Sequence, residues 1–124
     1  MNKICERLHV AIQPFREAIL SYDFGTAYHC DSTAALVRQF GNYCGISSDD
    51  LHFYEIAADI HDLGKIEVPA SIINKCGRLD KDELSIVRQH PVIGARILRE
   101  TLPVELQSIV PLVECHHERF DGEG

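Results

Sequence analysis

The stretch SSDDLHFYEIAADIHDLGK, residues 47–65, decides the fold class of this chain. Ser47 followed three residues later by Asp50 resembles a capping box, which marks the start of a helix. Apolar residues and one histidine then recur at helical spacing and share one face: Leu51, Tyr54, Ala58 and His61. Because Gly64 is a common helix stop, we predict a helix from Ser47 to about Leu63.

Helical patterns continue on both sides of this stretch, and no segment alternates with the period of a strand. We therefore predict an all-α fold, a compact bundle of five or six helices. Outside the central helix we expect helices over residues 3–21 with a break or restart at Pro14, 27–44, 80–89, 91–101 and 103–119 with a bend at Pro111, and one helical turn at 70–73. Residues 1–27 would form an N-terminal helix leading into the bundle, and residues 28–124 the functional domain.

Local signals refine these boundaries. Asp80 and Glu83 offer a second capping box, and the proline after His90 marks a joint between two helices. On the helix over residues 27–44, His29 shares a stripe at helical spacing with Thr33, Val37, Phe40 and Cys44. This stripe predicts that His29 faces the core.

Composition limits the classes of function. The chain has 124 residues, enough for one core, and its net charge of −7 argues against binding a nucleic-acid polymer. No apolar run approaches the ~20 residues that cross a bilayer, and the N-terminus MNKICERLHV lacks the pattern of a secretory signal. We therefore expect a cytoplasmic protein without membrane insertion. Its cysteines form no CxxC pair and are expected to be reduced and buried: Cys5, Cys30, Cys44, Cys76 and Cys115.

Most of the histidines lie on, or at the end of, predicted apolar faces: His29, His61, His90, His116 and His117. Any one of them alone would more simply be a hydrogen-bonded core residue. A bundle core cannot easily hold all of them together unless something satisfies their polar atoms, and a metal centre does so. Ligands drawn inward from several helices are the way in which bundles build two-metal sites.

Two dipeptides sharpen this prediction. Neighbouring residues on a helix point about 100° apart, so His61 and Asp62 can flank one point, and a carboxylate can bridge two ions. His116 and His117 repeat the arrangement from another helix, and such a centre can lower the pKa of a bridging water and neutralise a phosphate. Lys65 then lies at the rim, where it would bind a phosphate oxygen rather than serve as an ordinary solvated lysine.

Residues 61–98, HDLGKIEVPASIINKCGRLDKDELSIVRQHPVIGARIL, resemble the HD-GYP branch of the HD phosphohydrolase superfamily. The matching frame is HDxGKIxxPxxIxxKxGxLxxxE, then HPxxGxxIL, then HHExxDGxG at residues 116–124. His29 stands at the place of the family's first ligand histidine. The resemblance therefore covers residues 28–124, most of the chain.

The resemblance implies a helical bundle that hydrolyses cyclic di-GMP to the linear dinucleotide or GMP through a metal-bridging hydroxide. It implies two divalent metal ions, of which iron or manganese is usual, while the spacing alone leaves zinc or nickel open. Asp62 and Lys65 are the implied catalytic residues, and Lys65 would bind the substrate phosphate. The implied metal ligands are His29, His61, Asp62, His90, His116 and His117, with Asp62 as the bridge between the two ions.

The chain departs from the family pattern at three places. Gly25 stands where some members have a glutamate that holds a third metal, which favours a two-metal site. The Gly-Tyr-Pro motif that gives the HD-GYP branch its name would continue with Tyr-Pro after Gly124. We therefore expect a domain truncated inside this motif and lacking the family's C-terminal helices. The family's last metal-ligand aspartate would also lie downstream. Asp59 and Asp121 are candidate substitutes, although a surface role suits both of them better.

Other polar residues near the predicted ligands have simpler roles. Cys30 and Cys115 each adjoin a ligand histidine but point about 100° away from it on a helix, so we expect them to pack in the core. Glu118, Asp121 and Glu123 are expected to line the mouth of the site or to form a frayed end.

Three functions remain open from the sequence. The leading one is a metal-dependent cyclic di-GMP phosphodiesterase. The others are a catalytically inactive metal-binding or ligand-sensing regulatory domain, and a broader nucleotide phosphohydrolase. The expected partners are a cyclic dinucleotide, a regulatory or signalling domain, and a second copy of the chain, because an incomplete bundle exposes apolar surface.

Overall fold

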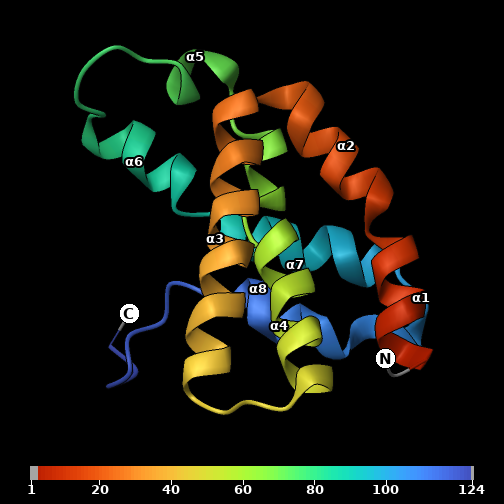
Figure 1. Ribbon diagram of the computed structural model, residues 1–124. Coiled ribbons are helices and arrows are strands. Elements are labelled where there is room, and N and C mark those ends of the chain that lie inside the picture. The colour runs from red at the N-terminus through yellow and green to blue at the C-terminus, as the bar shows by residue number, and fades with distance from the viewer. Residues whose placement is uncertain (1–2, 124) are drawn as a thin grey trace.

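The computed structural model describes residues 3–123, and all regular structure in that range is helical (Figure 1). Gly124, where we expect the Gly-Tyr-Pro motif to be cut short, lies outside the described residues. The elements are α1 (Lys3–Ala11), α2 (Gln13–Tyr22), α3 (Phe24–Tyr43), α4 (Ser48–Ile60), the 3-10 helix η1 (Leu63–Glu67), α5 (Ala70–Ile73), α6 (Lys81–Val87), α7 (His90–Thr101), the 3-10 helix η2 (Val104–Ile109) and α8 (Val110–Glu114). The all-α prediction is therefore confirmed.

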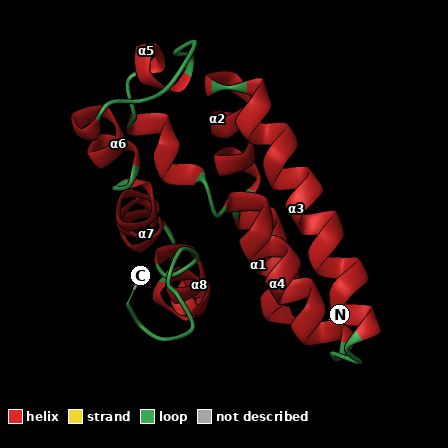
Figure 2. Ribbon diagram, turned by 90° about the vertical axis from the view of Figure 1, so that its left-hand side faces the viewer, coloured by secondary structure: helices red, strands yellow, loops and turns green. Residues whose placement is uncertain are grey.

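The long helices α3 and α4 form an antiparallel hairpin, and the other elements pack around it (Figure 1). Figure 2 shows α7 and α8 nearly end-on beside this hairpin, so that they cross it, while α1 lies along α4. The core between them is aliphatic, and its fully buried side chains include Leu8, Ile12, Ile19, Ile56, Ile60, Leu63, Leu98, Ile109 and Val113. No helix in the described part of the chain is long and apolar enough to cross a membrane.

Side-chain caps fix several helix starts. The Asp80–Glu83 capping box is present as predicted, and it begins α6. At α4 the Oγ of Ser47 accepts a bond from the backbone N–H of Asp50 at 3.2 Å. The Asp50 carboxylate accepts a hydrogen bond from the Ser47 hydroxyl and none from the Ser47 backbone N–H. The predicted Ser47–Asp50 capping box is therefore only half formed.

The predicted stop of the central helix is wrong in position and in cause. α4 ends at Ile60 rather than at Leu63, and Gly64 lies inside η1. A Cβ atom on Gly64 would lie 1.9 Å from the carbonyl oxygen of His90 and 2.7 Å from the backbone nitrogen of Gly94. Glycine is required there because η1 and α7 touch backbone to backbone. This contact brings the turn at residues 61–62 against the start of α7.

The C-terminal part is also less regular than predicted. The single helix expected over residues 103–119 is instead η2 followed by α8, which ends at Glu114. Pro111 lies in the first turn of α8, where its missing N–H is tolerated. His116 and His117 therefore lie in the turn after α8 rather than on a helix.

The stripe predicted to place His29 toward the core is wrong, because α3 lies at the edge of the bundle (Figure 2). The side chain of His29 is 58% exposed and Phe40 is 69% exposed. The residues of α3 that are buried are Thr26, Cys30 and Gly41. All five cysteines are free, as predicted, but only Cys5 and Cys30 are buried; Cys44, Cys76 and Cys115 are exposed.

Candidate metal centre

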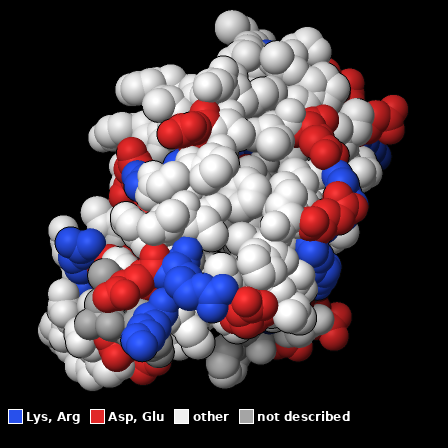
Figure 3. Space-filling view, turned by 90° about the vertical axis from the view of Figure 1, so that its right-hand side faces the viewer, with Lys and Arg blue, Asp and Glu red and all other residues white. Residues whose placement is uncertain are grey.

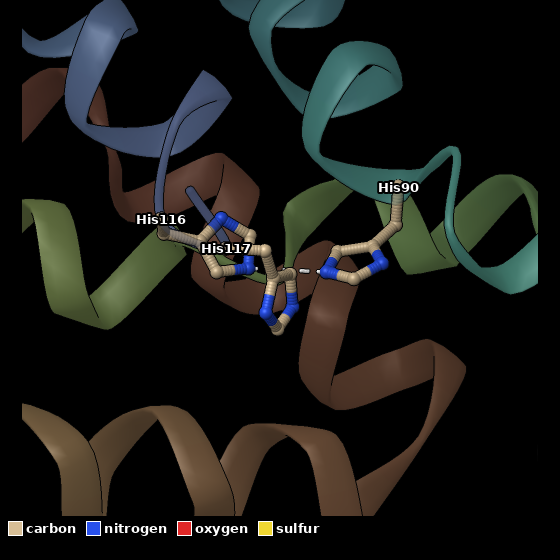
Figure 4. A group of neighbouring side chains, drawn as sticks. All are labelled: His90, His116 and His117. Carbon is tan, nitrogen blue, oxygen red and sulfur yellow. Dashed lines mark hydrogen bonds between the residues drawn. The ribbon is translucent and has the colours of Figure 1, made fainter. Parts of the chain in front are cut away.

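Two groups of potential metal ligands lie side by side at the meeting point of α3, α4, α7 and α8. In each group the ligand atoms lie within 4.8 Å of one another. The first group, His29, His61 and Asp62, comes from α3 and the turn after α4. The second group, His90, His116 and His117, comes from the start of α7 and the turn after α8 (Figure 4). The fold thus brings together all six residues that the sequence singles out as ligands.

The carboxylate of Asp62 lies between the two groups and is almost completely buried, with 1% of the residue exposed. Its Oδ2 lies 3.4 Å from the Nε2 of His61 and 3.7 Å from the Nε2 of His29. Its Oδ1 lies 3.1 Å from the Nε2 of His90 and 3.8 Å from the Nε2 of His116. One oxygen therefore faces each group, which is the arrangement that a bridging carboxylate needs.

Three of the imidazoles are held by the same local device. The Nδ1 of His61, His90 and His116 each lies 2.6–2.7 Å from the backbone carbonyl three residues earlier. A carbonyl only accepts, so each Nδ1 carries the proton and donates it. The Nε2 of each ring is then left with a lone pair, which is the form that binds a metal ion.

This tautomer leaves the ligand groups without a proton between their facing nitrogens. The Nε2 atoms of His90 and His116 lie 3.1 Å apart (Figure 4), and those of His29 and His61 lie 3.2 Å apart. Where both members of a pair carry the proton on Nδ1, as His90 and His116 do, two lone pairs face each other without a proton to share. A cation between the rings resolves that conflict, so the donor set fits a metal ion on the chemistry of its own residues.

The titration behaviour of the group favours the same state. Burial acts to raise the pKa of Asp62, but the neighbouring His90 and His61 rings and the Lys65 ammonium hold that pKa well below its usual range. Burial lowers the pKa of His116 to about 4, and burial also lowers the pKa of His117. Near neutral pH the carboxylate is charged and these imidazoles are neutral, which is the state required for binding a cation.

Lys65 lies where the sequence predicts, at the rim of the site. Its Nζ is 2.7 Å from the Oδ2 of Asp62, and its side chain is 22% exposed. Lys65 therefore touches both the candidate bridging carboxylate and solvent. A cation in this position can meet an incoming anion without leaving Asp62.

Two clefts open from the ligand groups. One, of about 390 Å³, is lined by residues that include His29, Tyr54, His61 and His116. The other, of about 710 Å³, lies between the α6–α7 joint and the C-terminal segment and includes His90 and His117. Glu118 and Glu123 line this second cleft, as predicted for the mouth of the site, whereas the Asp121 carboxylate pairs with Arg119.

The residues considered as secondary ligands lie outside both groups. Cys30 is buried, and burial raises the pKa of its thiol to about 12, which suits a packing role. Cys115 is exposed, so its predicted place in the core is wrong. Asp59 faces Arg16, with its Oδ2 3.9 Å from the Arg16 Nε. Its side chain is only 16% exposed and burial raises its pKa, so the surface role expected for it is wrong.

Two supporting features escaped the sequence reasoning. The first is the close contact of Gly64 with Gly94, which sets the distance between the two ligand groups. The sequence does not show it, because a glycine that follows a helix has the pattern of a helix stop. The carbonyls that orient the imidazoles carry no side-chain signal at all. The only available clue is that His61, His90 and His116 each follow a helix end or joint, where carbonyls are unpaired.

The chain is similar to known proteins over most of its length. A family model described as HD domain matches residues 13–124. The chain is 32% identical over 124 residues to the cyclic di-GMP phosphodiesterase response regulator RpfG of Xanthomonas campestris, covering 100% of this chain and 33% of that protein. It is 35% identical over 102 residues to a cyclic di-GMP phosphodiesterase of Thermotoga maritima, covering 82% of this chain and 28% of the relative.

A third relative carries a different substrate in its name. The chain is 29% identical over 99 residues to the 3'3'-cGAMP-specific phosphodiesterase 2 of Vibrio cholerae, covering 80% of this chain and 19% of that protein. The chain thus spans about a third or less of the length of these curated relatives.

Proposed function

This chain belongs to the HD domain family, and we propose that it acts as a metal-dependent phosphodiesterase on cyclic di-GMP. The observation that carries the proposal is the position of Asp62. Its two oxygens face two separate groups of imidazoles, so one buried carboxylate can join two metal ions. Five imidazoles and a carboxylate suit several divalent metals, and we propose an iron or manganese pair.

A pair of divalent ions, when bound, activates water and neutralises the charge on a phosphate. The protein supplies the rest of the chemistry. Asp62 would join the two halves of the site, and the backbone carbonyls hold three imidazoles with Nε2 facing inward. Lys65 would place its ammonium against the phosphate and stabilise the charge that develops on it.

The choice of substrate rests on the relatives. Two of those named above act on cyclic di-GMP by name, while a third is specific for 3'3'-cGAMP. Both of these substrates are cyclic dinucleotides, and we propose cyclic di-GMP as the substrate of this chain. RpfG is named a response regulator, which supports a further proposal that this chain works together with a signalling domain.

Metal analysis of anaerobically purified protein, paired with a cleavage assay, tests the proposed function. We expect about two metal ions per chain and conversion of cyclic di-GMP to the linear dinucleotide or GMP. Bound metal without turnover of any cyclic dinucleotide would instead identify a ligand-sensing module. Protein that takes up no iron, manganese, zinc or nickel would refute the metal centre.

Self-association is a separate proposal, supported by the exposed face of α3. Its large apolar side chains are between 63% and 89% exposed: Phe24, Tyr28, Leu36, Phe40 and Tyr43. At ~150–250 Å² for each aromatic side chain, this face offers on the order of 500 Å² or more, which approaches the ~800 Å² per partner of a standard interface. We propose that a second copy packs there. Light scattering should show a dimer that Phe40→Glu converts to a monomer; a monomeric wild type would contradict it.

A further inference from the structure

The larger of the two clefts, of about 710 Å³, is lined by two of the candidate metal ligands, His90 and His117, and otherwise by residues outside the ligand groups. Its volume falls in the range of ~300–1,000 Å³ typical of sites for small organic molecules. His90 and His117 connect it directly to the second ligand group. This cleft therefore adjoins the metal centre, where a substrate phosphate would bind.

The cleft contains one cationic side chain, Arg88, and that side chain has no partner. Among the described residues, Arg88 makes no side-chain hydrogen bond and no ion pair. Most arginines of this acidic chain are paired with a carboxylate, and Figure 3 shows basic and acidic side chains adjacent on another face. In the same cleft Glu114 is already bound by Arg99. An unpaired guanidinium beside a candidate phosphate site is the residue best suited to a second phosphate.

The rest of the cleft is divided between an apolar wall and two carboxylates. Leu84 and Val92 lie on the wall and are 37% and 61% exposed, so they offer aliphatic surface to a ligand. Glu118 and Glu123 line the cleft as well, and their carboxylates bind no donor among the described residues. A ligand that fits must therefore bring an anion for Arg88, a flat apolar face for the wall, and N–H donors for the glutamates.

We infer that this cleft is a subsite for the second nucleotide unit of the substrate, with Arg88 bound to the phosphate that is not cleaved. This inference rests on the proposed function. Arg88 forms a two-pronged pair with that phosphate, and the base lies on Leu84 and Val92. Guanine presents N–H donors on its pairing edge at both N1 and N2, and these match Glu118 and Glu123. Adenine presents an acceptor at N1, which a carboxylate repels.

Binding and cleavage together test the role of Arg88. The probe is the phosphorothioate analogue of cyclic di-GMP, which resists hydrolysis, titrated by calorimetry against wild type, Arg88→Gln and Arg88→Lys. Arg78→Gln is the matched control, because Arg78 is also exposed and without an ion pair but lines neither of the two clefts. We expect Arg88→Gln to weaken binding about tenfold or more, Arg88→Lys to recover part of that loss, and Arg78→Gln to change it less than twofold.

A cleavage assay with bis(p-nitrophenyl) phosphate, a diester with a single phosphate, separates this inference from the proposed function. The loss caused by Arg88→Gln should be about tenfold larger on cyclic di-GMP than on this small ester. Equal losses on both esters, or equal binding by the Arg88 and Arg78 variants, would overturn the inference while the phosphodiesterase assignment stands. Equal affinity for cyclic di-AMP and cyclic di-GMP would overturn the guanine assignment alone. A protein that binds metal and cleaves neither ester would contradict the proposed function itself.

Discussion

The two ligand groups of the candidate metal centre are alike in plan and different in charge. Each has one buried, one partly buried and one exposed member, and each contains at least one imidazole oriented by a backbone carbonyl. The first group contains the Asp62 carboxylate and adjoins Lys65. The second group has imidazoles only, drawn from a helix start and from the turn after α8.

This difference means that the second group has no anion of its own. It borrows one, because the Oδ1 of Asp62 lies 3.1 Å from the Nε2 of His90. Neutral ligands cannot offset the charge of a divalent ion in a buried place, so an adjacent carboxylate is needed. The comparison therefore predicts that metal binding in both halves depends on the charge of Asp62, while each half depends separately on its own histidines.

The largest effect should come from Asp62→Asn. The amide has nearly the same shape but no charge, so we expect both metal ions to be lost, with content below about half an ion per chain and cleavage reduced about 100-fold or more. Elemental analysis and the cleavage assay measure both quantities. Asp59→Asn is the matched control, since Asp59 lies one helical turn earlier but faces Arg16. If Asp62→Asn lost only one of the two ions, the carboxylate would not be shared.

The next largest effect tests how the halves are held together. Gly64→Ala places a methyl group 1.9 Å from the His90 carbonyl oxygen, and backbone on both sides leaves nothing that can move aside. Overpacking of this kind costs about 3 kcal/mol of the free energy of unfolding, which should lower the melting temperature by roughly 10 °C. Thermal unfolding followed by circular dichroism measures it.

Gly25→Ala is the control for this substitution. Its added methyl would meet only the side chain of Asp23, at 3.3 Å, so we expect a change of about 1 kcal/mol or less. Equal melting temperatures for the two variants would show that the contact between η1 and α7 has room to relax.

Single histidine deletions should separate the two halves. His29→Ala and His117→Ala each remove the exposed member of one group. We expect each variant to lose about one metal ion per chain and to keep the other, with cleavage reduced about 10-fold to 100-fold. Elemental analysis of both single variants and of the double variant measures how many metal ions each one keeps. Full retention of both ions in either variant would remove that histidine from the ligand set.

Lys65→Met should have a smaller effect on metal than any of these changes. The ammonium lies 2.7 Å from Asp62 but would not bind a metal ion itself. We expect metal content to stay near that of the wild type while kcat falls about 10-fold to 100-fold, because the charge opposite the phosphate is lost. Steady-state kinetics with cyclic di-GMP tests this role. A fall in metal content that matches the fall in kcat would assign Lys65 to the support of Asp62 instead.

The sequence predicted the parts of this centre that depend on residue type and local spacing. The all-α fold follows from helical periodicity, and the capping box at Asp80 and the joint at His90 are both confirmed. The six ligand positions were named from the histidine excess and from the family resemblance, and the fold brings them together. These features are local, so one chain is enough to show them.

The predictions that are wrong concern features that depend on contacts between distant segments. The local pattern at Gly64 predicts a helix stop, because its backbone contact with His90, 26 positions away along the chain, leaves no trace in the neighbouring sequence. The stripe through His29 was assigned to the core because periodicity gives the direction of an apolar face but not what covers it. On α3 that face is exposed, and Phe40 is an example.

The smallest predicted effect concerns the cysteines next to the two ligand groups, Cys30 and Cys115. Cys30 follows His29 and is buried at 2% exposure, while Cys115 precedes His116 and is exposed. Burial raises the pKa of the Cys30 thiol to about 12, and the thiolate is the reactive form. A maleimide should therefore label Cys115 in the folded protein within minutes and leave Cys30 unlabelled until the protein unfolds, as read by peptide mass spectrometry.

Because Cys115 adjoins the second group, its labelling should slow when metal orders the turn that carries His116. The first group has no exposed cysteine that could report on metal binding in the same way. Rapid labelling of Cys30 in the native state would show that the α3–α4 half opens, and would make it the looser of the two.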